Sequence, residues 1–301
     1  MRAIVLAHRQ PQPLHILYAV MSADVAFLAE LLSVYKVTLD VRTLTSFREW
    51  LAPRFCSPSL VQTGKRIAET LIRHIPSDAL TTMSLASTLT WTTPAQFAHL
   101  LAIAPSDTIS LETVLAEALA VDRSDHVTEL LQSGAPLTGR VAIRAMCASR
   151  RMMFRRASPI QTATLLAASW KGQSMPGLSA RLVARAARPL LAQHADPLHR
   201  DNAIAAALAA LFRLVSASEV EPLIHLLTAE AHRQEMVAGR FTENDTSMPS
   251  SLPSPFRMHR FASSHELIAT AVRMATTQAA DTREPQSDPP SSVTFWYQTP
   301  N

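Results

Sequence analysis

The sequence predicts an all-α protein in which short helices stack as antiparallel pairs. Its 301 residues include 47 Ala and 37 Leu but only six Gly, and Ala and Leu lose little free energy on entering a helix. Capping residues delimit several short helices, and pairs of apolar residues recur at spacings near the length of one helix pair. The scarcity of Gly argues against a turn-rich β-sandwich and against an enzyme built on Gly-rich phosphate loops.

The first part of the chain combines an apolar stretch with one ambiguous segment. Residues 14–34 are largely apolar, but Asp24 and Glu30 interrupt them, and a charge is costly at the centre of a bilayer. We therefore expect a buried helix pair there and no transmembrane segment. Between residues 36 and 42, apolar and polar residues alternate with the period of a strand, for which residues 3–7 are the only plausible partner. Because two strands alone are marginal, an extended linker is the alternative.

Capping residues delimit helices further along the chain. Thr93 and Gln96 form a capping box at the start of an apolar run. Ser218 and Glu221 form a second box, and Gly239 is placed to end the helix that this box opens. Apolar residues at helical spacing predict a helix between these two: Ile204, Leu208, Leu211 and Val215.

The composition changes near the C-terminal end of the sequence. Residues 241–262 are rich in Ser and Pro, which is typical of a linker. Residues 263–280 have the apolar spacing of a short amphipathic helix, which either docks on the body or awaits a partner. Residues 281–301 have the composition of a disordered tail. We therefore expect residues 1–240 to form one helical, repeat-like domain.

Pairs of adjacent apolar residues suggest an internal repeat of about 33 residues. The pairs are Leu31-Leu32, Leu71-Ile72, Leu100-Leu101, Leu130-Leu131, Leu190-Leu191 and Leu226-Leu227. The wide gap between the fourth and fifth pairs would then correspond to two repeats. Stacked helix pairs have this signature, because each pair can bury its apolar face only against its neighbours. A non-repetitive helical domain, in which such pairs recur by chance, is the alternative.

Residues 113–137 resemble one ankyrin repeat. The matching positions are Thr113 at the opening of the first helix, Leu115, Ala118, Val127, the double Leu at Leu130 and Leu131, and Gly134-Ala135 after the second helix. Two departures stand out. Val114-Leu115-Ala116 replaces the usual Pro-Leu-His, and Asp122-Arg123 replaces the Gly-His between the helices. Elsewhere the match is degenerate.

The resemblance implies a degenerate ankyrin-like α-solenoid that binds another protein through an exposed face. The basic residues are 25 Arg and only three Lys, a bias typical of GC-rich bacteria, in which ankyrin-like proteins are often effectors delivered into a host cell. The resemblance therefore implies a bacterial effector that is secreted into a host cell and acts on a host protein. Without secretion, the two widely separated cysteines favour a soluble protein in the reducing cytoplasm.

Positive charge is concentrated in the middle of the chain. The net charge is +4, yet residues 130–195 contain ten cations and no Asp or Glu, so the rest of the chain carries −6. At about 100° per residue, Arg181, Arg185 and Arg188 lie on one helix face. On this spacing, Leu182, Val183, Ala186 and Leu190 are expected on the opposite, buried side.

The Arg-rich block, residues 140–188, is the candidate partner-binding region. If residues 140–156 form one helix, Arg140, Arg144, Arg151 and Arg155 share a face, and with Arg181, Arg185 and Arg188 they are the predicted partner-binding residues. Three interpretations are open. The block pairs with acids elsewhere in the fold, binds an acidic protein surface, or binds nucleic acid or an anionic membrane. Arg suits bidentate contacts with carboxylate or phosphate.

No arrangement of residues points to catalysis. The sequence contains no Walker-type loop, no Gly-x-Gly-x-x-Gly run, no Gly-x-Ser-x-Gly elbow and no His-Glu-x-x-His. We therefore expect a non-enzymatic protein with no cofactor and no metal site. Glu230 and Glu235 flank His232 on a predicted helix and are expected on a solvated face. The alternative is an enzyme on an unrecognised helical scaffold, which would need a concave pocket lined by polar groups.

Overall fold

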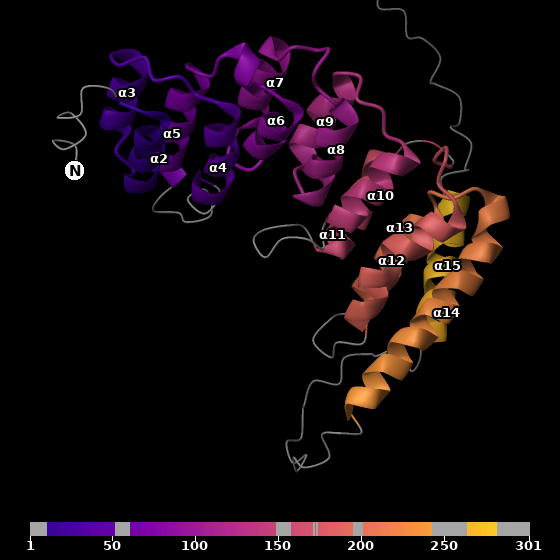
Figure 1. The fold of residues 1–301 in the computed structure, drawn as a ribbon. Coiled ribbons are helices and arrows are strands. Elements are labelled where there is room, and N and C mark those ends of the chain that lie inside the picture. The colour runs from indigo at the N-terminus through magenta and orange to yellow at the C-terminus, as the bar shows by residue number, and fades with distance from the viewer. Residues whose placement is uncertain are drawn as a thin grey trace, which may run out of the picture.

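All regular secondary structure in the described part of the chain is helical (Figure 1). A computed structural model describes residues 11–51, 61–148, 158–170, 172, 174–194, 201–242 and 264–281. The α-helices are α2 (Pro13–Ser22), α3 (Val25–Ser33), α4 (Val41–Leu51), α5 (Val61–Ile72), α6 (Thr82–Thr88), α7 (Pro94–Ile103), α8 (Leu111–Ala120), α9 (Ser124–Gln132), α10 (Gly139–Ala148), α11 (Pro159–Ser169), α12 (Ala180–His194), α13 (Asp201–Phe212), α14 (Ala217–Thr242) and α15 (Ser264–Asp281). A short 3₁₀ helix, η2 (Ser77–Ala79), precedes α6. The predicted all-α fold is confirmed.

Alternate helices pack side by side along the molecule. The even-numbered helices from α2 to α14 each contact the next even-numbered helix. Among the odd-numbered helices, α3 contacts α5, and α7, α9, α11, α13 and α15 form a second series of neighbours. Figure 1 shows an elongated body that begins with α2 and α3 and ends with the long helices α12 to α15.

One apolar core runs through the described helices. Its buried members extend from Ile16 on α2 to Ala275 on α15, and they include residues from every α-helix. The amphipathic helix α15 docks on the body, because Leu267 and Ala271 are fully buried where it contacts α13 and α14. The expected linker and tail fall largely on residues 243–263 and 282–301, which lie outside the described residues.

The apolar stretch at residues 14–34 forms the helix pair α2 and α3, which buries one face of each helix but leaves Leu14 and Val34 exposed. Asp24, one of its two acids, caps α3, and its Oδ1 accepts a hydrogen bond of 2.9 Å from the Phe27 N–H. In the described ranges, no helix combines the length and the apolar character needed to cross a membrane.

Residues 36–40 form neither a strand nor a helix. Leu39 is buried, and Asp40 Oδ1 accepts a hydrogen bond of 2.8 Å from the Thr43 N–H in the first turn of α4. The alternation therefore belongs to an irregular segment that leads into α4 and that begins with a left-handed φ of +49° at Lys36. Residues 3–7, the proposed partner strand, lie outside the described residues.

The recurring apolar pairs correspond only partly to a single repeat. Pairs at residues 31, 71, 100 and 130 lie near the ends of α3, α5, α7 and α9. The pairs at 190 and 226 instead lie on the even-numbered helices α12 and α14. The odd-numbered helix α11 carries Leu165-Leu166, of which Leu166 is fully buried. This pair lies within the gap from 130 to 190, so the interpretation of that gap as two repeats stays a prediction.

Two predicted helix boundaries were right and two were wrong. Thr93 and Gln96 form the expected capping box of α7, and Gly134 ends α9 with a left-handed φ of +86°. Helix α14, however, begins at Ala217 instead of after Ser218, and it continues through Gly239. The carboxylate of Glu219 in its first turn accepts a hydrogen bond from the Ala180 N–H of α12. Gly permits a left-handed conformation but does not impose one, so it need not end a helix.

The segment 113–137 forms two helices, α8 and α9, with a tight turn between them. Helix α8 starts at Leu111 after the capping residue Ser110, so Thr113 is its third residue and does not open it. Asp122 in the turn has a left-handed φ of +56°, a conformation in which Gly is the least strained residue. Asp122 therefore adopts a backbone conformation in which Gly is usually found.

Polar contacts join this unit to the preceding helices. The Arg123 guanidinium donates hydrogen bonds to the carbonyl oxygens of Leu89 (2.8 Å) and Thr90 (2.9 Å), which lie 34 and 33 residues earlier. His126 Nε2 lies 3.3 Å from Thr92 Oγ1, again across 34 residues. Burial of the His126 ring, assisted by the positive charge of Arg123, lowers the pKa of His126 to about 4.

We expect Gly134→Ala to lower the free energy of unfolding by about 1 kcal/mol, because Ala is strained at positive φ. No atom lies within 4 Å of a Cβ built at this position, so crowding would not contribute. Gly134→Asn should lower the free energy of unfolding by less than Gly134→Ala, since Asn adopts the left-handed conformation more readily than Ala. Urea unfolding of the three proteins measures both differences, and an equal cost for Ala and Asn would contradict the assignment.

We expect the buried His126 to make the fold less stable in mild acid. In the unfolded state His126 has the ordinary His pKa of about 6.5, whereas in the folded state its pKa is about 4, so the unfolded state binds a proton at a higher pH. The stabilisation is therefore complete above about pH 6.5 and is lost as the pH falls toward 4, with about 2 kcal/mol lost between about pH 7 and about pH 5. Urea unfolding at both pH values should show this loss in the wild type and not in His126→Gln. The exposed His99 provides the control, and His99→Gln should keep the wild-type pH dependence.

Candidate functional site

The predicted partner-binding residues within the described part of the chain lie on two neighbouring helices. Arg140 and Arg144 are exposed on α10, and Arg181 and Arg185 are exposed on α12. Arg188, also on α12, has 41% of its side-chain surface exposed. The remaining two, Arg151 and Arg155, lie outside the described residues, because α10 is described only as far as Ala148.

Backbone contacts place the starts of α10, α12 and α14 beside one another. The Gly139 N–H of α10 donates to the carbonyl of Pro176, just before α12, at 3.3 Å. The Ala180 N–H of α12 donates to the Glu219 carboxylate of α14 at 2.6 Å. Further along, Arg188 on α12 reaches Glu230 on α14, so these two helices run parallel.

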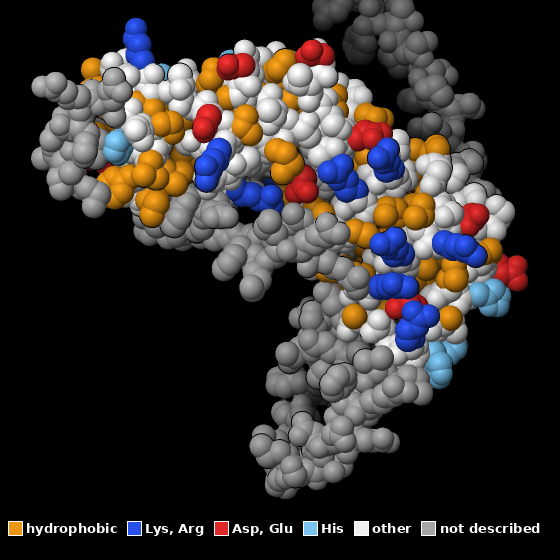
Figure 2. Space-filling model, viewed as in Figure 1, with side chains coloured by type: hydrophobic (Ala, Val, Ile, Leu, Met, Phe, Trp, Pro, Cys, Tyr) orange, Lys and Arg blue, Asp and Glu red, His pale blue; other side chains and the backbone are white. Residues whose placement is uncertain are grey.

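This alignment places four exposed arginines on two neighbouring helices, close to where these helices start. Arg140 and Arg181 are each the second residue of their helix, and Arg144 and Arg185 follow one turn later. Since α10 contacts α12 and the two helices start together, the two pairs lie at similar heights along neighbouring helices. Figure 2 shows Lys and Arg side chains gathered over the region of α10 and α12.

The exposed face of α12 is wider than its sequence predicts. Val183, Ala186 and Leu190 are buried as expected, but Leu182 is 36% exposed, so its placement on the buried side was wrong. Leu182 is separated from Arg185 by about 60° around the helix, which places it at the border of the exposed arc. We call the residues Arg181, Arg185 and Arg188 the α12 ridge.

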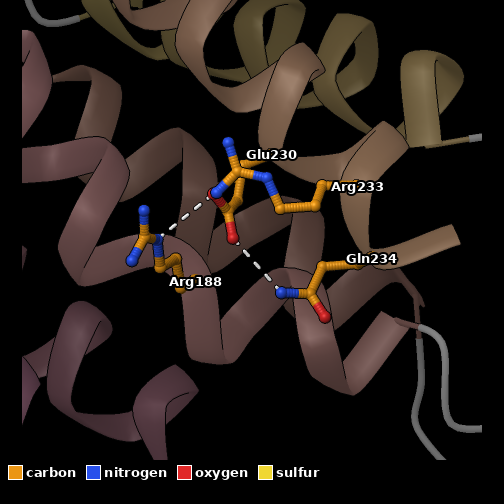
Figure 3. Close-up of polar contacts among 4 residues, drawn as sticks. All are labelled: Arg188, Glu230, Arg233 and Gln234. Atoms are coloured by element: carbon orange, nitrogen blue, oxygen red, sulfur yellow. Dashed lines mark hydrogen bonds and ion pairs between the residues drawn. The ribbon is translucent and has the colours of Figure 1, made fainter. Parts of the chain in front are cut away.

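Glu230 forms an ion pair with Arg188 of the α12 ridge (Figure 3). It is 7% exposed, and its Oε2 lies 3.2 Å from both Arg188 Nε and Arg233 Nη1. Its other oxygen, Oε1, accepts a hydrogen bond of 3.2 Å from the Gln234 amide. Glu230 thus links α12 to α14 and neutralises one charge of the Arg-rich block.

Pairing within the fold therefore accounts for only part of the positive charge. Arg144 donates a hydrogen bond of 2.8 Å to the neutral hydroxyl of Thr113. For Arg140, Arg181 and Arg185, no ion pair is formed with any residue in the described ranges. Three exposed cations on two neighbouring helices are therefore available for contact with solvent or with a ligand.

The sequence interpretation placed Glu230 on a solvated face, and the structure shows it buried. A signal for this was present, because Glu230 follows the buried Leu223 and Leu227 at helical spacing. Its partner could not be found in the same way, because Arg188 lies on another helix and the register between α12 and α14 depends on the fold.

Comparison of the chain with models of protein families, with curated proteins and with solved structures gives no match in any of the three. The assignment of a function therefore depends on the sequence and the geometry of this molecule. In the part of the chain that the structure describes, no three His, Cys, Asp or Glu side chains are grouped as they would be around a metal ion.

We expect Glu230→Ala to lower the free energy of unfolding by about 1–2 kcal/mol, because it removes the link between α12 and α14 and leaves Arg188 and Arg233 without their carboxylate. Glu221→Ala on the same helix is the matched control. Glu221 is 87% exposed and lies 4.0 Å from His225, so its loss should change stability by less than about 0.5 kcal/mol. Urea unfolding measures the free energy of unfolding of both variants. An equal decrease in the two variants would show that Glu230 does not link the helices.

Proposed function

We propose that this chain is a non-enzymatic, ankyrin-like protein-interaction module whose contact surface is the Arg-rich face of α10 and α12. The observation that carries the proposal is the set of exposed arginines on two adjacent helices. Three of them, Arg140, Arg181 and Arg185, have no ion-pair partner among the described residues.

The ankyrin-like assignment is supported by the way successive helix pairs meet. Each even-numbered helix contacts the next, as stacked pairs require. Asp122 adopts a left-handed conformation at the position where the resembled family has Gly, and Gly134 ends the second helix of the same unit. Contacts from Arg123 and His126 span 33 and 34 residues, close to the period suggested by the apolar pairs.

The positions of the arginines argue that their charge serves binding. Arg140 and Arg181 stand in the first turns of α10 and α12, where the helix dipole disfavours a cation by about 0.3–1 kcal/mol. Arg140 and Arg144, like Arg181 and Arg185, are also four residues apart, a spacing at which like charges repel. A surface that destabilises its own helices becomes favourable when an anionic partner covers it.

An acidic protein surface is the partner that we propose. Arginine forms bidentate hydrogen bonds with carboxylates as readily as with phosphates. Proteins that bind single-stranded nucleic acid also offer aromatic side chains for stacking. Helix α10, helix α12 and the described side chains of α14 contain no Phe, Trp or Tyr, so the surface lacks this means of recognition.

We expect the double variant Arg181→Glu, Arg185→Glu to bind an acidic peptide about tenfold or more weakly than the wild type at low ionic strength. The probe is a fluorescein-labelled peptide of Glu and Ser as long as α12, and binding is measured by fluorescence anisotropy. The double variant Arg66→Glu, Arg73→Glu makes the same charge change at exposed positions on α5 and directly after it, and should bind almost normally.

A duplex DNA of mixed sequence, titrated at several salt concentrations, tests the competing class of partner. Tighter binding of DNA than of the peptide, with a steep salt dependence that the ridge variant abolishes, would overturn the proposal in favour of a nucleic-acid binder. Equal loss of peptide binding in the α5 variant would show that only total charge matters.

A further inference from the structure

Exposed leucines border the α12 ridge on two sides. Leu182 on α12 and Leu226 on α14 are each 36% exposed. They are among the few large apolar side chains in the described ranges that are exposed to this extent, and the other such residues lie on or beside α2, α3, α6 and α7. Figure 2 shows hydrophobic side chains between the cations in the region of α10, α12 and α14.

Helix geometry places the two leucines on opposite sides of the ridge. Glu230 draws Arg188 toward α14, so Arg188 marks the α14 side of α12. Leu182 lies about 120° from Arg188 around α12, beyond Arg185, and therefore on the side toward α10. Leu226 precedes Glu230 by one turn on α14, so it shares the side of α14 that faces α12.

Glu230 also orients the guanidinium of Arg188 for contact with a second carboxylate. The carboxylate of Glu230 engages Arg188 through Nε at 3.2 Å. Figure 3 shows that the two terminal nitrogens of Arg188 point away from Glu230. Because this ion pair already orients the guanidinium, less conformational entropy is lost when its terminal nitrogens bind a further anion.

We propose that the α12 ridge binds an acidic protein segment that also carries aliphatic side chains. Its carboxylates would contact Arg181, Arg185 and Arg188, and its aliphatic groups would cover Leu182 and Leu226. This inference rests on the proposed function and specifies the chemistry of the partner. Charge complementarity selects an acidic segment, and the flanking leucines select a protein segment over a polyphosphate, which has no aliphatic groups to bury against them.

Two peptides as long as α12 and equal in charge provide the test. One places Leu among its Glu residues at helical spacing, and the other has Ser at the same positions. Fluorescence anisotropy with the full chain should show that the leucine peptide binds about tenfold more tightly than the serine peptide. The double variant Leu182→Ser, Leu226→Ser should abolish this preference and leave binding of the serine peptide unchanged.

Met83→Ser is the matched control, because Met83 is 64% exposed on α6, away from the ridge. Circular dichroism of the leucine and Met83 variants should match the wild type, since Leu182, Leu226 and Met83 are each at least 36% exposed in the native fold. Glu230→Gln should weaken binding of both peptides, because the amide no longer holds Arg188 by a charged contact.

The outcomes separate the inference from the function on which it rests. Equal binding of the two peptides by the wild type, or a preference that survives the leucine substitutions, would overturn the inference while the acidic-partner function stands. Failure of both peptides to bind would overturn the proposed function itself. Tighter binding of duplex DNA, or of vesicles containing phosphatidylserine, would identify a phosphate-bearing ligand and overturn both.

Discussion

The structure depends on the burial of the apolar face of each helix against neighbouring helices. A short amphipathic helix is not stable alone. In the described part of this chain, successive even-numbered helices contact one another, and one core continues from Ile16 to Ala275. Stability is therefore distributed along the molecule. Polar contacts add to this packing, such as the hydrogen bonds from Arg123 to the carbonyl oxygens of Leu89 and Thr90.

This way of burying apolar surface also determines where charge can gather. Side chains on the outer faces of successive even-numbered helices are neighbours in space although they are far apart in sequence. Cations on α10 and α12 are therefore carried by neighbouring helices. Glu230 pairs with Arg188 and Glu219 accepts a hydrogen bond from a backbone N–H, and neither forms an ion pair with Arg181 or Arg185.

Much of the local structure could be predicted from residue spacing and capping chemistry. The box at Thr93 and the left-handed Gly134 depend on residues within one turn of the chain, so sequence patterns identify them. Errors arose where a distant contact decided the outcome. Helix α14 starts beside α12 through Glu219, and Leu182 is left partly exposed at the border of α12. Glu230 has a partner, Arg188, that comes from another helix.

The sequence by itself determined the helical class, the apolar faces and the segregation of charge, since these follow from composition and from spacing within a helix. Only the tertiary structure decided which cations are paired and which are exposed. The physical reason is that an ion pair depends on the register between helices, and the register of α12 against α14 is set by packing over the whole pair. Arg188 and Arg185 are three residues apart on the same face, yet only Arg188 is within reach of a carboxylate in the described part of the chain.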